Sequence, residues 1–160
     1  MSKPKFVYVT YIAAPPEKVW QALTQPGMTE QYWFGYRVTA NGKAGDRMTA
    51  INPAGVKAHD DPILESDPPR RLSYAWKPLY KDMDGERPSR VTFDLEPFKG
   101  QTKLTIVHDE FDEGSKIFGL ISNGWPAVLS SMKTYLETGK GMPSAWADEA
   151  QKSRTGVESA

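Results

Sequence analysis

The chain has 160 residues, of which 39% are hydrophobic and 25% are charged, as is typical of one globular domain rather than a disordered chain. Its 20 Lys and Arg residues balance its 20 Asp and Glu residues, so the excess positive charge of a nucleic-acid-binding surface is missing. There is no cysteine, which excludes disulfides and thiolate chemistry. No apolar run approaches 18 residues and no secretory leader is recognisable, so we expect no membrane span and a cytoplasmic location.

The beginning of the chain predicts a strand followed by two short helices. Residues 5–12 are rich in β-branched and aromatic side chains, which favours a strand. Pro15 and Pro16 end that strand and suit a first helical turn, so residues 16–24, with one apolar face, predict a helix. A second short helix is predicted over residues 27–33.

The middle of the chain consists of short apolar runs separated by turn residues. The predicted strands cover residues 36–41, 45–52, 56–65, 71–77, 90–96 and 103–110. A polar loop is expected at residues 81–86. The alternation is clearest where Val91, Phe93 and Leu95 share one face of a strand. Because short turns join consecutive strands, we expect antiparallel pairing.

The last predicted element is a helix over residues 115–138 with one apolar stripe, ended by Gly139. Pro126 clashes with the preceding turn, so a kink or a short break is expected there. Residues 140–160 are predicted to form a flexible tail. A sheet with one apolar face and a helix with one apolar stripe must bury against each other. The sequence therefore predicts one α+β domain over residues 1–139, with a curved antiparallel sheet of about seven strands around the long helix.

Several stretches, in this order, resemble one known superfamily. They are residues 14–20 (APPEKVW), 30–33 (EQYW), 67–76 (DPPRRLSYAW), 102–108 (TKLTIVH) and 124–136 (GWPAVLSSMKTYL). The chain resembles the START-like (SRPBCC, Bet v 1-like) superfamily with its helix-grip fold, and within it the family of activators of heat-shock-protein ATPase homologues. The resemblance implies a deep cavity between sheet and long helix, which in this superfamily often holds lipids, sterols or polyketides. It implies no particular reaction.

The candidate ligand-binding residues are mostly aromatic side chains expected on the inner face of the sheet, on the long helix or at the cavity mouth. They are Trp33, Phe34, Tyr74, Trp76, Phe93, His108, Trp125 and Met132. Large rings can line a pocket or fill it. The sequence leaves both open, although a drug-sized ligand would need about 300–1,000 Å³.

Two histidines and one acid are the polar residues considered for a chemical role. His108 shares its strand face with Leu104 and Ile106, so it is expected to point into the cavity and could act as an acid or base. Glu65 is the acid that could accompany it if it faces inward. His59 is expected to be a solvated strand residue. No metal site and no cofactor are expected, because thiols, clustered ligands and phosphate-binding loops are missing from the sequence.

Three functions remain open at this point. The leading hypothesis is a non-catalytic carrier or sensor that binds a small hydrophobic or aromatic molecule. The second is an enzyme of the cyclase, dehydratase or hydrolase type that uses His108 with an inward acid. The third is a chaperone-associated or homodimeric interaction module, with an exposed apolar patch at Trp33 and Phe34 or around Trp146.

Overall fold

The computed structural model describes residues 4–79 and 85–143. In chain order, the elements are β1 (Phe6–Ile12), α1 (Pro16–Thr24), α2 (Pro26–Tyr32), β2 (Arg37–Thr39), β3 (Arg47–Ile51), β4 (Lys57–Asp67), β5 (Arg71–Trp76), β6 (Ser89–Phe98), β7 (Gln101–Asp109) and α3 (Lys116–Thr138). Each predicted strand and helix is therefore present, with ends that differ from the prediction by a few residues.

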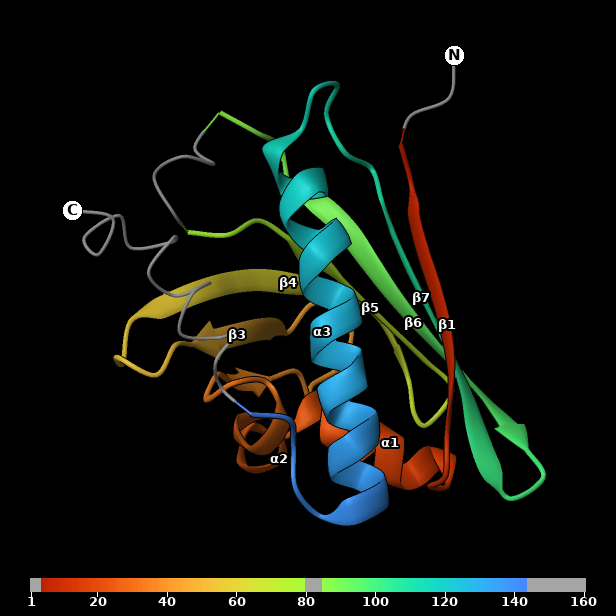
Figure 1. Ribbon diagram of the computed structural model, residues 1–160. Helices are drawn as coiled ribbons and strands as arrows, with labels where there is room; N and C mark the ends of the chain where they lie inside the picture. The colour runs from red at the N-terminus through yellow and green to blue at the C-terminus, as the bar shows by residue number, and fades with distance from the viewer. Residues whose placement is uncertain (1–3, 80–84, 144–160) are drawn as a thin grey trace.

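The strands form one seven-stranded sheet in the order β1-β7-β6-β5-β4-β3-β2, and all the pairs are antiparallel. Figure 1 shows α3 lying across one face of the curved sheet, with β1 on one side of the helix and β3 on the other. The two short helices lie near the C-terminal end of α3. This arrangement confirms the predicted α+β helix-grip fold.

The long helix α3 begins and ends as its sequence predicts. Ser115 Oγ accepts a hydrogen bond from the N–H of Phe118 at 3.1 Å, and Gly139 follows the last turn with a left-handed φ of 91°. Of the two alternatives predicted at Pro126, a kink or a short break, the break is wrong, because α3 is continuous through this residue. Trp125 and Val128 are both buried beside it. We attribute the continuity to this packing, which offsets the roughly 3 kcal/mol that an interior proline costs.

The core lies between α3 and the inner face of the sheet. Period-two alternation places Tyr74 on β5, Phe93 on β6 and Ile106 on β7 on this face, and all three side chains are fully buried. Phe93 pairs directly with Leu72 on one side and with Ile106 on the other. The inner face predicted for β6 is thus confirmed.

An irregularity in β4 explains one wrong prediction. Ala50 pairs with His59 and Ile51 pairs with Lys57, so Ala58 is the additional residue of a β-bulge. Ala58 and His59 are consequently both buried, with exposed fractions of 0% and 5%. The prediction that His59 is a solvated residue is wrong, because the bulge interrupts the strand's alternation.

Two predicted segments extend beyond the described residues. Residues 81–84 of the predicted polar loop lie outside them, and so do residues 144–160 of the predicted tail, including Trp146. Of that tail, the structure describes residues 140–143, where the N–H of Met142 donates to Ser131 Oγ at 3.0 Å. Within residues 4–79 and 85–143, no helix has the length and apolar character needed to cross a membrane.

Candidate functional site

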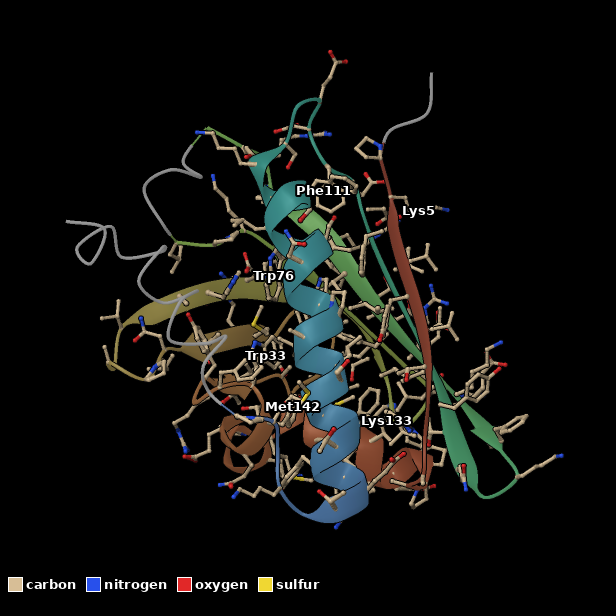
Figure 2. The ribbon with its side chains drawn as sticks, in the orientation of Figure 1. Lys5, Trp33, Trp76, Phe111, Lys133 and Met142 are labelled. Atoms are coloured by element: carbon tan, nitrogen blue, oxygen red, sulfur yellow. The ribbon has the colours of Figure 1, made fainter. Side chains whose placement is uncertain are left out.

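A small cavity lies between α3 and the part of the inner sheet face formed by β2 to β5. Its volume is about 70 Å³. Its walls come from the segment after α2, from four strands and the segment after β5, and from one side of α3. The lining residues are Trp33, Tyr36, Val38, Ala50, His59, Trp76, Pro78, Leu120, Ile121, Gly124, Trp125 and Val128. Figure 2 shows Trp33 and Trp76 on the side of α3 nearer β3, whereas Lys133 lies on the side nearer β1.

The size of this cavity limits what it can hold. An apolar cavity of about 150 Å³ is known to accept benzene, and a drug-sized ligand needs about 300–1,000 Å³. This cavity is therefore far smaller than a drug-sized site. Leu120, 47% exposed, belongs to the lining and gives the space an edge at the surface. A ligand can thus place at most part of its body inside without a movement of α3.

The eight predicted site residues divide into two groups. Three of them line the cavity, namely Trp33, Trp76 and Trp125. The other five do not, and they are the fully buried Tyr74, Phe93, His108 and Met132 and the partly buried Phe34. The predicted set thus contains three residues that line the cavity and five that lie in the surrounding core or pack against it.

Aromatic rings fill most of the space under α3. The Trp125 ring lies 5.5 Å from that of Trp33, 5.0 Å from that of Trp76 and 5.8 Å from that of Phe93, measured between ring centroids. Tyr74 stacks on Trp76 at 6.2 Å. Contacts of this kind contribute about 0.5–1.5 kcal/mol each beyond the burial of area. The rings therefore form part of the hydrophobic core, and the cavity is the space that remains between them.

His108 belongs to a chain of hydrogen bonds that fixes its protonation. The indole N–H of Trp125 donates to His108 Nδ1 at 2.9 Å. An indole nitrogen can only donate, so Nδ1 must be the unprotonated nitrogen and Nε2 carries the proton. Nε2–H then donates to Ser89 Oγ at 2.7 Å, and the Ser89 hydroxyl donates to the Trp76 carbonyl at 3.0 Å. Each side-chain polar atom of this chain has a partner.

This environment makes His108 a neutral structural residue. Burial, and next the nearby His59, lower the pKa of His108 from 6.5 to about 3. Both ring nitrogens are occupied, so a proton can leave or arrive only if the chain of hydrogen bonds breaks. His108 faces the inner side of the sheet, as its strand position indicated, but an acid/base role near neutral pH does not fit it.

The acid expected to accompany His108 lies on the opposite face of the sheet. The Glu65 side chain is 53% exposed, and its Oε1 lies 3.2 Å from Arg71 Nε. Arg71 also contacts Asp94 at 3.2 Å, which gives a small ionic cluster on the outer face. The sheet therefore separates Glu65 from His108, and the two cannot act on one substrate.

Sequence reasoning missed a different polar pair, His59 and Asp61. Asp61 is only 6% exposed, and its Oδ2 lies 3.3 Å from His59 Nδ1 and accepts the Lys77 N–H at 3.3 Å. The His59 ring lies 4.0 Å from that of Trp76 at the cavity wall. Their spacing of two residues on one strand was the available signal, since it places both side chains on the same face. The bulge at Ala58, which turns that face inward, was not recognisable.

The side chains of the described residues do not form a metal centre. Between residues 4 and 143, leaving out 80–84, no group of three or more His, Asp or Glu side chains is arranged to hold a metal ion. The pair of His59 and Asp61 can instead bind a polar group of a ligand, or exchange a proton with one.

Comparisons with solved structures agree with this fold. Protein MLL2253 from Mesorhizobium loti is 29% identical, with a TM-score of 0.72 over 84% of this chain and 97% of that chain. The Aha1 dimer from Colwellia psychrerythraea is 22% identical, with a TM-score of 0.70 over 87% of this chain and all 100% of that chain. DynU16, from the dynemicin biosynthetic locus, is 21% identical, with a TM-score of 0.68 over 88% of this chain and 49% of that chain. The last two show a shared fold alone.

Comparison at the level of sequence gives the family. No curated protein matches the chain. The family model described as Activator of Hsp90 ATPase homolog 1-like protein matches residues 13–137, which is most of the chain. This protein therefore belongs to the family of Activator of Hsp90 ATPase homolog 1-like proteins.

Proposed function

We propose that the protein binds a small aromatic or otherwise apolar molecule in the cavity between the sheet and α3, and that it acts as a carrier or sensor. The observation that carries this proposal is the cavity itself. Three indole rings, those of Trp33, Trp76 and Trp125, surround a space that the core does not fill, in a fold known for ligand binding. The relative DynU16 comes from a biosynthetic locus, which agrees with a small organic ligand.

A binding role fits the polar residues better than catalysis does. His108 is held neutral with both nitrogens bonded, and Glu65 lies on the outer face of the sheet. Among the residues discussed above, the pair that could still serve an enzyme is His59 and Asp61, whose Nδ1 and Oδ2 lie 3.3 Å apart. In the described part of the chain, no third His, Asp or Glu joins them in a metal-binding group.

The volume of about 70 Å³ sets the size of the ligand. One ring can enter among the indoles once the walls relax, and any further part of the molecule would extend past Leu120. The experiment is a thermal-shift series with benzene, naphthalene and anthracene. A ligand at about 100 times its dissociation constant stabilises by roughly 2.7 kcal/mol, which for this size is several degrees. We expect shifts with one and two rings and a smaller shift with three; no shift with any of them would contradict the proposal.

Two glycines of α3 provide a matched pair of variants. A Cβ added at Gly119 or at Gly124 would meet nothing within 4 Å, but only Gly124 lines the cavity. Gly124→Leu should fill the space and abolish the thermal shift. Gly119→Leu makes the same change five residues earlier in α3, at a position that does not line the cavity, and should keep the thermal shift. Equal ligand shifts in the two variants would place the ligand elsewhere.

We also propose that the protein forms a homodimer through β1, which is an edge strand of the sheet. Val7, Val9 and Tyr11 expose between 45% and 52% of their surfaces on its outer face, which is unusual for three apolar residues in a row on an edge. The Colwellia relative of the same fold is described as a dimer. The patch expected at Trp33 is not available, because Trp33 is only 8% exposed.

Sedimentation equilibrium tests the dimer. Val9→Lys puts a charge in the middle of the edge and should shift the protein to monomer. Val56→Lys changes an equally apolar residue, 58% exposed in the turn between β3 and β4, and should leave the dimer intact. A wild-type protein that sediments as a monomer at all concentrations would contradict the proposal.

A further inference from the structure

Two buried donors of the core have no hydrogen-bond acceptor. Among the side chains of residues 4–79 and 85–143, only Tyr74 Oη and Trp76 Nε1 are buried polar atoms without a partner. Two comparable donors nearby are satisfied. Tyr32 Oη donates to the Ala22 carbonyl at 2.8 Å, and Trp125 Nε1 donates to His108 at 2.9 Å. An unmatched pair of this kind therefore calls for an explanation, because natural cores satisfy nearly all such groups.

The two unmatched donors are neighbours on β5, and one of them, Trp76, lines the cavity. Tyr74 and Trp76 are two residues apart on β5, so both point to the inner face, and their rings stack at 6.2 Å. Trp76 is nine-tenths buried and lines the cavity, whereas Tyr74 lies behind it, fully buried. Across the cavity, the wall contributed by α3 consists of Leu120, Ile121, Gly124, Trp125 and Val128, which offer carbon surface.

The electrostatic environment limits the charge of a partner for these donors. The carboxylate of Asp61 lies close enough to raise the pKa of the Tyr74 hydroxyl, after the larger effect of burial. Its Oδ2 already accepts from the Lys77 N–H and lies 3.3 Å from His59 Nδ1. A second negative charge beside it would be repelled in this buried setting. A neutral acceptor meets no such repulsion.

We propose that the molecule bound in this cavity is a neutral aromatic compound with an acceptor on or beside its ring, such as a ring nitrogen or a carbonyl, to which Trp76 Nε1–H donates. This inference rests on the proposed function, because it specifies the ligand of the same site. An indole nitrogen is a donor only, so a ligand with donors alone leaves it unpaired. An aromatic carboxylate has the acceptor but also the charge that Asp61 disfavours.

Quinoline and naphthalene are the probes, because they have the same shape and differ in one ring nitrogen. Both are neutral near neutral pH. Their dissociation constants are measured by calorimetry, with 2-naphthoate as the charged comparison. We expect quinoline to bind about tenfold more tightly than naphthalene, as one buried hydrogen bond would give, and 2-naphthoate to bind more weakly than quinoline. The indole proton of Trp76 should move downfield in the proton–nitrogen NMR spectrum with quinoline and not with naphthalene.

Two tryptophan variants assign the effect. Trp76→Phe removes the donor and should reduce the quinoline preference to less than about twofold, whereas Trp33→Phe, which changes another ring of the same wall, should keep it. Equal binding of both probes by the wild-type protein would overturn this inference and leave the proposed function standing. Binding of neither probe would overturn the proposed function itself. Should Trp76→Phe fail to fold, the wild-type ratio and the Trp76 proton shift decide the question.

Discussion

The two ends of the space under α3 use the same kinds of side chain in opposite ways. At the closed end, formed by Ser89, His108 and Trp125, each donor finds an acceptor, and the last link reaches the Trp76 carbonyl. At the open end, around His59 and the Trp76 ring, a cavity remains and the indole N–H of Trp76 has no acceptor among the described residues. From this difference we infer that the closed end holds α3 against the sheet, whereas the open end can bind a ligand.

The largest effect should come from breaking the closed end. His108→Phe keeps an aromatic ring but leaves Trp125 Nε1–H without its acceptor and Ser89 Oγ without its donor. We expect a loss of about 2–4 kcal/mol in the free energy of unfolding, measured with urea. His59→Phe, the matching change at the open end, should cost less than half of that. Equal losses in the two variants would remove the distinction between the ends.

Acid should weaken the closed end through the same histidine. Because the pKa of His108 falls from 6.5 to about 3 on folding, the unfolded chain binds a proton between these values that the folded chain does not. The contribution of His108 to stability is complete above pH 6.5 and is lost as the pH falls toward 3, by up to about 1.4 kcal/mol per pH unit. The carboxylates also change the stability in this pH range. Subtracting the unfolding free energy of His108→Gln from that of the wild type at each pH leaves the contribution of His108 alone. A difference that is flat with pH would contradict a neutral, buried His108.

A pair of tyrosines sharpens the comparison with smaller effects. Tyr32→Phe removes a hydroxyl that donates to the Ala22 carbonyl and should destabilise by about 1 kcal/mol. Tyr74→Phe removes a buried hydroxyl without an acceptor in the described part of the chain, so it should be neutral or slightly stabilising. Thermal unfolding of both variants and the wild type under the same conditions measures the two stability changes. A Tyr74→Phe loss as large as that of Tyr32→Phe would show that Tyr74 is satisfied within the protein.

The fold was predictable because its main signals are local. The alternation of Val91, Phe93 and Leu95 gave a strand face, and the stripe from Ile117 to Met132 gave the buried side of α3. Gly139 marked the C-terminal end of that helix in the sequence, and the structure shows it as the C-cap. The break at Pro126 was predicted wrongly because the local cost of proline was visible in the sequence, whereas the packing of Trp125 and Val128 that offsets it was not.

The site was predictable only in part, because it depends on strand register. Trp33, Trp76 and Trp125 were identified from residue type and position, and they line the cavity. His59 and Asp61 were missed because a bulge at Ala58 turns their face inward, and nothing in the sequence marks this bulge. The volume of the cavity depends on how closely the large rings pack against one another. The order of residue types along the chain does not determine these packing distances.

The most direct test of the cavity as a binding site is a crystal structure of the protein soaked in iodobenzene, with the iodine located by anomalous scattering. We predict an anomalous peak among the rings of Trp33, Trp76 and Trp125, on the β3 side of α3. Iodine found only on outer surfaces, such as the exposed face of β1, with the three indoles unmoved, would contradict the proposal that this space receives a ligand.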